Sequence, residues 1–160
     1  MAYKRTTWTE KYEKETTPRF VECIGKMAGK FGEGKMLIAT PKLIDELIRQ
    51  IPKGRLTTIN AIRNKLAQEF NVDVTCPITT GIFTWIVAHK TEEDRAKGMN
   101  RKDLSPYWRV IKEDGALNPK YPGGETQQTE YLNMEGFILI PNRTGKKLMI
   151  KDFKHYLFNY

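Results

Sequence analysis

The chain has 160 residues, the size of one domain with room for a small N-terminal layer. Its hydrophobic share of 39%, with three Trp, seven Tyr and seven Phe, can fill one core, which excludes disorder of the whole chain. Nothing approaches the roughly 18 consecutive apolar residues of a membrane span, and the first residues lack the apolar stretch of a secretory signal. We therefore expect a cytoplasmic protein that does not contact membranes.

The formal net charge of +8 is distributed unevenly along the chain. Residues 51–90 carry five basic and two acidic side chains, and residues 137–160 carry five basic and one acidic. Residues 91–136 instead have seven basic and nine acidic side chains. Basic segments suit a polyanion because cations release counterions from a phosphate backbone. A role in solubility alone explains the charge equally well.

Cysteine and histidine are too few to predict a metal centre. The two cysteines, Cys23 and Cys76, are far apart in sequence, as are His89 and His155. In an intracellular chain, two such cysteines are expected to be ordinary thiols. We expect no metal and no cofactor.

The first regular helix is expected after an N-terminal extension that spans residues 1–40. Within that extension only 35–38 has an extended pattern. Thr40 followed by Pro41 is a typical helix start, and apolar residues then recur at helical spacing as far as Ile51. Pro52 and Gly54 end this helix in a turn.

Two further helices separated by a short connector form a candidate helix-turn-helix. Thr58 is the predicted N-cap of the first, and Pro77 begins the second. Most such pairs serve packing alone, but the second helix is also a possible recognition helix. We expect the DNA contacts to come from the following residues of the turn and the two helix starts: Lys53, Arg55, Thr57, Thr58, Thr79, Thr80 and Gly81.

The last third of the chain predicts a short strand, a loop, a helix and a hairpin. The strand is expected in SPYWRVIKEDG, and the helix over 125–135 with Gly136 as its cap. FILIPN and KKLMIKDF then form a hairpin whose turn is basic. We predict a mainly α fold with small β: a winged helix-turn-helix domain at 41–136, with 137–160 as a C-terminal β-hairpin and tail packed on it.

The order of motifs resembles the C-terminal DNA-binding domain of O6-alkylguanine-DNA alkyltransferases, including the alkyltransferase-like members. The matching landmarks run over roughly residues 41–136 in the order IPKGRLTT, CPITTG, PYWRV, DGALNPKYPGG and MEG. The resemblance implies a winged helix-turn-helix that enters the minor groove and rotates a damaged guanine into a pocket. It also implies a cysteine that takes the alkyl group, activated by a histidine and a glutamate.

The motif is degenerate at the reacting positions. Pro106 and Arg109 match it, but Tyr107 stands in place of the cysteine and Trp108 in place of the histidine. A phenol near pKa 10 is a poorer nucleophile than a thiol near 8.5, and an indole cannot act as a base. We therefore expect no alkyl transfer and no enzyme activity. Glu135 matches the family's glutamate and is expected to have lost its partner.

The resemblance also implies a lesion pocket. Its expected residues are Tyr107, Trp108, Tyr121, Pro122, Gly123 and Gly124. The two aromatic residues of the motif could stack on a rotated base, or they could fill the pocket. Ile78 falls where the family has an arginine finger, and Ile59 where it has a tyrosine. Since both lie on apolar helix faces, packing in the core is the simpler expectation for them, although an apolar side chain can also wedge between base pairs.

The predicted function is non-catalytic binding of double-stranded DNA, with sensing of alkylated guanine for a downstream repair protein, by a monomer. The alternative is a protein- or small-ligand-interaction module that reuses the fold without DNA. The distribution of acidic groups separates the two: Glu92, Glu93 and Asp94 would have to crowd the face of Thr79 and Thr80 for the alternative to hold. A third interpretation is an enzyme that uses Tyr107 or Cys76 in another transfer.

Overall fold

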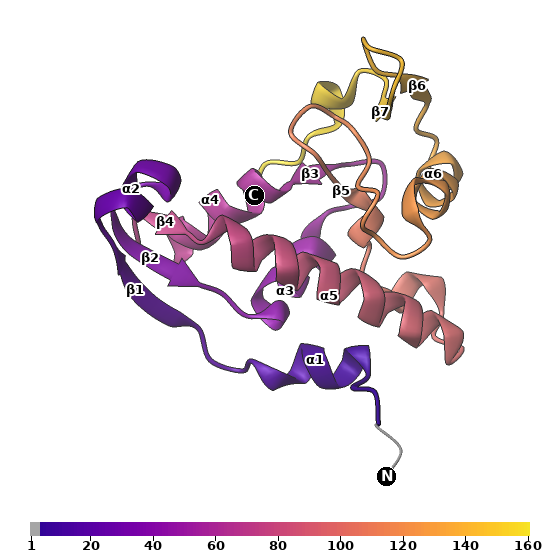
Figure 1. Cartoon of the computed structure of the whole chain (residues 1–160). Helices are drawn as coiled ribbons and strands as arrows, with labels where there is room; N and C mark the ends of the chain where they lie inside the picture. Colours follow the sequence, from indigo (N-terminus) through magenta and orange to yellow (C-terminus); the bar gives the residue numbers. More distant parts are fainter. Residues whose placement is uncertain (1–3) are drawn as a thin grey trace.

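The computed structural model describes residues 4–160 (Figure 1). Helices predominate among these residues, as predicted, and the strands are short. The α-helices are α1 Trp8–Lys14, α2 Gly25–Phe31, α3 Pro41–Gln50, α4 Ile59–Glu69, α5 Pro77–Ala96 and α6 Gly124–Met134. The strands are β1 Arg19–Cys23, β2 Gly34–Ile38, β3 Thr57–Thr58, β4 Val74–Thr75, β5 Val110–Ile111, β6 Leu139–Pro141 and β7 Leu148–Ile150. Three 3-10 turns are η1 Arg101–Asp103, η2 Tyr107–Arg109 and η3 Phe153–Tyr156.

The helices at the centre of the fold begin where their sequence signals place them. The Thr40 side chain accepts a hydrogen bond from the backbone N–H of Leu43 at the start of α3, and Thr58 does the same for Ala61 in α4. Pro41 and Pro77 occupy the first turns of α3 and α5. These starts confirm the predictions for all three helices.

Helix α5 is longer than its apolar pattern suggests, because it continues through the charged stretch to Ala96. It packs on α1, α3 and α4 and forms the axis of the fold (Figure 1). Three buried threonines, Thr80, Thr84 and Thr91, each donate a hydroxyl hydrogen bond to the carbonyl four residues earlier. This internal bonding allows polar side chains to lie on the buried face.

The N-terminal residues build directly on the same core. Strand β1 pairs antiparallel with β2, and β2 pairs in parallel with β4, immediately before α5. The predicted extended piece at 35–38 is thus confirmed, whereas α1, β1 and α2 were not predicted. Helix α1 lies across α5 (Figure 1), where the Glu93 carboxylate accepts backbone hydrogen bonds from Trp8 at 2.9 Å and Thr9 at 3.3 Å.

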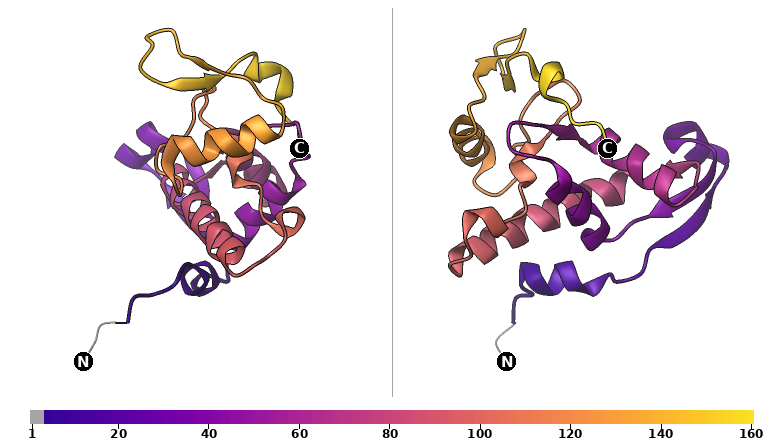
Figure 2. Two further views of the ribbon diagram at one scale, coloured as in Figure 1. Left: turned by 90° about the vertical axis from the view of Figure 1, so that its right-hand side faces the viewer. Right: turned by 180° about the vertical axis from the view of Figure 1, so that it is seen from behind.

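The C-terminal hairpin of β6 and β7 forms as predicted and lies beside α6 and the loop that follows β5 (Figure 2). A bridge between Ala116 and Met149, and a hydrogen bond from Leu117 N–H to the Leu148 carbonyl, join it to that loop. The strand predicted around PYWRV is shorter than expected. Only Val110 and Ile111 pair with β3, because the preceding residues turn as η2.

Among the residues described, no helix combines the length and the apolar character that a bilayer span requires.

Candidate nucleic-acid interface

Tyr107, which the sequence resemblance aligns with the family's cysteine, is completely buried. Its hydroxyl donates a hydrogen bond of 2.8 Å to Glu92 Oε1, and its ring meets the edges of Tyr121 and Trp108 at centroid distances of 5.3 and 5.5 Å. The side chain is therefore enclosed by its neighbours, and no open space remains around its ring. The expectation that Tyr107 lines an open lesion pocket is not met, and packing explains this residue.

The Glu92 carboxylate also accepts a hydrogen bond from the Tyr131 hydroxyl, at 2.7 Å. Burial, and then the hydrogen bond to Glu92, raise the pKa of Tyr131. Burial, and then the charge of Glu92, raise the pKa of Tyr107 far above its ordinary value. Both phenols are thus held as protonated donors, the opposite of what a nucleophile requires.

Glu135 has two side-chain partners, the indole of Trp108 and the guanidinium of Arg109. Its Oε1 accepts the indole N–H of Trp108 at 2.9 Å, and its carboxylate pairs with the Arg109 guanidinium at 2.6 Å. Arg109 also donates to the Ile51 carbonyl at 2.7 Å. The expectation was that Glu135 had lost its partner; in the structure it instead joins α6, η2 and the end of α3 in a largely buried network.

The predicted pocket loop is part of the scaffold. Tyr121 is 3% exposed, and its hydroxyl donates to the Val110 carbonyl at 3.2 Å. Gly123 has φ +71°, and a Cβ there would lie 2.6 Å from Gln127 Cβ, so glycine is required for the turn into α6. Pro122 and Gly124 belong to the same turn. The family motif thus shapes a turn here, and Trp108, which is 2% exposed, offers no open ring face to a base.

The first turns of α5 carry an exposed apolar surface. Ile78 is 54% exposed and Ile82 47%, with the exposed Gly81 between them. The prediction that Ile78 packs in the core is therefore wrong. Ile59 is partly buried against the core, as expected. An exposed isoleucine pair one helical turn apart is costly in water, and such a surface commonly marks a binding site.

A cavity of about 540 Å³ opens beside this surface. Helix α5 provides one wall and the loop after β5 the other; the lining residues are Ile78, Gly81, Ile82, Trp85, Lys112, Asn118, Pro119 and Lys120. A smaller cavity of about 250 Å³ adjoins it, since Lys112 and Asn118 line both. The sequence reasoning missed Ile82, Trp85 and the two lysines. One signal in the sequence could have identified the two apolar ones: α5 contains more apolar residues than a single buried stripe of a helix can hold.

The predicted threonine contacts face inward. Thr57 and Thr58 are buried, and the Thr80 hydroxyl is bonded to the Cys76 carbonyl. The Thr79 hydroxyl is also buried, without a partner in the described residues. Phosphate contacts through these four hydroxyl groups are thus not available in this structure; contacts through the backbone N–H groups at the start of α5 stay a prediction. Gly81 alone of the α5 candidates is exposed.

The two predicted basic contacts in the turn after α3 lie away from the exposed face of α5. Lys53 is exposed but lines a different cavity, beside Glu135. The Arg55 guanidinium donates to the His155 carbonyl at 3.3 Å, which ties the turn to the C-terminal segment. The cations that do face α5 are Lys112 and Lys120.

The acidic residues of α5 lie at its other end. Glu92 bonds to Tyr107 and Tyr131, Glu93 caps α1, and Asp94 pairs with Lys90 at 2.6 Å. Twelve residues separate Thr80 from Glu92, which at 1.5 Å per residue is about 18 Å along the helix. These carboxylates do not crowd the start of α5, so the condition set for the alternative function is not met.

Among residues 4–160, no three His, Cys, Asp or Glu side chains gather in a way that could hold a metal ion. Both cysteines are buried free thiols.

Comparison with known proteins finds a structural likeness only. No protein-family model and no curated protein sequence matches the chain. Two solved structures are similar: S. pombe Atl1 in complex with damaged DNA containing O6-carboxymethylguanine, and S. pombe ATL in complex with DNA. Each has a TM-score of 0.50 and covers 75% of this chain and 94% of its own, at 17% and 16% identity respectively. The chain therefore shares the fold of an alkyltransferase-like protein.

Proposed function

We propose that this chain is an alkyltransferase-like protein that binds double-stranded DNA without chemical repair, through a winged helix-turn-helix of α4, α5 and the β6–β7 hairpin. The observation that carries the proposal is the exposed apolar start of α5, opposite two lysines and away from the acidic end of the helix. The shared fold of Atl1, whose structure holds damaged DNA, supports the same choice.

The proposed binding mode differs from the one that the motif implies. Ile78 and Ile82 are the side chains that enter the minor groove, where apolar wedges can separate base pairs. Lys112 and Lys120 are placed to contact phosphates across the cavity. An altered guanine would be accommodated in the cavity beside α5, because the completely buried Tyr107 leaves no open pocket at the degenerate motif. Recognition would then recruit a further repair protein to the site, with this chain acting as a cytoplasmic monomer.

Duplex binding is expected to weaken steeply with salt. The measurement is fluorescence anisotropy with a labelled duplex, plain or with one O6-methylguanine, at several salt concentrations. Each phosphate contact contributes a slope of about 0.9 in a plot of log affinity against log salt, so two lysine contacts predict a slope near 2 or steeper. A tighter complex with the modified duplex supports sensing. Binding that is absent or insensitive to salt for both duplexes would contradict DNA binding.

Substitution of Tyr107 by cysteine is expected to leave the protein unable to accept alkyl groups. The new thiol would lie at a completely buried position, where desolvation disfavours a thiolate, and the neighbouring indole of Trp108 cannot take its proton. Mass spectrometry after incubation with O6-methylguanine duplexes tests this, and the wild-type chain serves as the control. Stoichiometric methylation of Tyr107→Cys would overturn our interpretation of the motif.

A further inference from the structure

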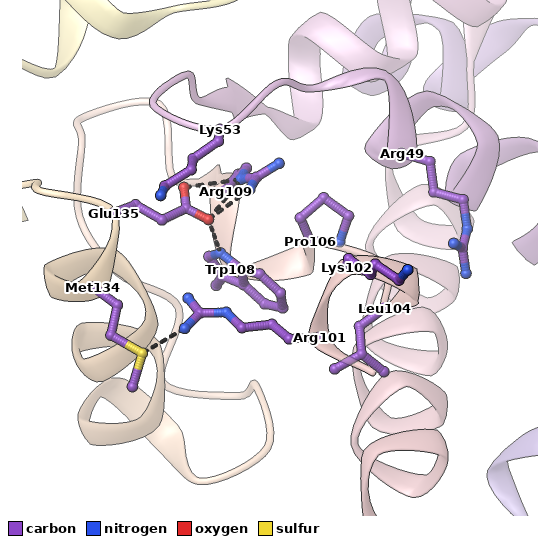
Figure 3. A pocket seen from close by; sticks show the side chains of 10 residues that line it. All are labelled: Arg49, Lys53, Arg101, Lys102, Leu104, Pro106, Trp108, Arg109, Met134 and Glu135. Atoms are coloured by element: carbon purple, nitrogen blue, oxygen red, sulfur yellow. Dashed lines mark hydrogen bonds and ion pairs between the residues drawn. The ribbon is translucent and has the colours of Figure 1, made fainter. Parts of the chain in front are cut away.

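A separate cavity, of about 440 Å³, lies between the end of α3, the turn after it, η1, η2 and the end of α6 (Figure 3). It shares no lining residue with the two cavities beside α5. Half of its ten lining residues are basic: Arg49, Lys53, Arg101, Lys102 and Arg109. Glu135 is the single acidic residue of the lining.

Only two of these cations have an acidic partner. Arg49 pairs with Asp45 at 3.2 Å, and Arg109 with Glu135 at 2.6 Å. Within residues 4–160, no carboxylate lies at ion-pair distance from Lys53, Arg101 or Lys102. Three uncompensated positive charges thus surround one concavity, an arrangement that like-charge repulsion disfavours unless an anion binds.

Neighbouring side chains hold one of these cations, the Arg101 guanidinium, in place. The Arg101 guanidinium lies 5.8 Å from the ring centroid of Trp108 and 5.6 Å from that of Tyr131, and it contacts the Met134 sulfur (Figure 3). Such cation–π contacts fix the planar group before a ligand arrives. Because Trp108 is 2% exposed and already stacked on Tyr131, the cavity has no aromatic face for a base. It can therefore recognise phosphate but not the base of a nucleotide.

We propose that this cavity binds an oligophosphate anion, such as pyrophosphate or the phosphate chain of a nucleoside triphosphate, independently of the DNA-binding surface at α5. Several adjacent phosphate charges match the three uncompensated cations. The cavity volume falls within the range of small-molecule sites, roughly 300–1,000 Å³. Arginine and lysine are the side chains that bind phosphate oxygens most strongly.

Isothermal titration of the full chain with inorganic pyrophosphate tests the proposal. The double variant Lys53→Gln, Lys102→Gln removes two exposed cations that make no side-chain hydrogen bond within the described residues, so its unfolding midpoint should be unchanged. We expect its affinity to fall by about tenfold or more, since the loss of even one charge-assisted hydrogen bond costs at least that factor. The matched control Lys26→Gln, Lys154→Gln has the same net charge and should bind like the wild type. No saturable binding, or equal losses in both double variants, would overturn the proposal.

Two further titrations identify the source of the phosphate and its relation to DNA. Equal affinity for tripolyphosphate and a nucleoside triphosphate supports recognition of the phosphate chain alone; tighter nucleotide binding would contradict it, because the cavity offers no aromatic face to a base. Duplex affinity should be the same in the cavity variant and its charge-matched control. A selective loss of duplex affinity in the cavity variant would overturn the independence of the two sites and assign the cavity to the DNA interface.

Discussion

Substitution of Glu135 by alanine is expected to lower the free energy of unfolding by about 3 kcal/mol, because it leaves a largely buried guanidinium without its counter-charge. The Glu135 side chain is 2% exposed and that of Arg109 13%. Removal of the carboxylate also leaves the buried indole N–H of Trp108 without its acceptor. The loss affects stability, since the network joins α6 to η2 and the end of α3.

Urea unfolding of matched variants on α6 measures this effect. Glu130→Ala removes an exposed carboxylate from the same helix and should change stability by less than about 0.5 kcal/mol. Glu135→Gln keeps an oxygen for the Trp108 N–H but no charge for Arg109, so an intermediate loss is expected. If Glu135→Ala were as stable as Glu130→Ala, the ion pair would not hold these elements together.

The double substitution Ile78→Asp, Ile82→Asp should weaken duplex binding by well over tenfold. It removes both proposed wedges and places two negative charges at the surface that is to approach phosphates, and like-charge juxtaposition at an interface costs several kcal/mol. Since both side chains are about half exposed, stability should change little. Anisotropy titrations with a plain duplex provide the measurement.

The control for this variant carries the same charge change elsewhere. Ile24 and Ile138 are 67% and 62% exposed and lie outside α5, so Ile24→Asp, Ile138→Asp isolates the effect of net charge. The control is expected to lose only the small part of affinity that two added charges remove at long range. Equal losses in the two variants would mean that α5 does not make the contact.

The burial of two residues, Ile78 and Thr80, differs from the sequence-based expectation for the same physical reason. Periodicity places Ile78 and Thr80 in a helix, but it cannot tell which side of the helix other elements cover. Thr80 is buried because its hydroxyl bonds to its own helix, and Ile78 is exposed because the loop after β5 remains separated from it by a cavity. The polar residue is therefore buried and the apolar residue exposed, which is the reverse of the usual pattern.

The degenerate motif shows a similar limit. The sequence alone excludes a thiol and a base from positions 107 and 108, and that conclusion needs only the chemistry of the side chains. It could not indicate that Glu92, 15 residues away, accepts the Tyr107 hydroxyl, or that Glu135 binds an indole and a guanidinium. These contacts join groups from separate elements, and local patterns contain no information on such distances.

The sequence by itself determined where α3, α4 and α5 begin, the terminal hairpin, and the absence of a thiol from the motif. Each follows from local rules: hydroxyl caps, proline at the first turn, alternation in strands and the identity of the residues. Only the tertiary structure decided that the aromatic motif is closed, that the start of α5 is open, and that basic residues from three separate segments surround the cavity between α3, η1, η2 and α6. Those features depend on how elements distant in sequence pack together, because burial and charge density are properties of the assembled chain.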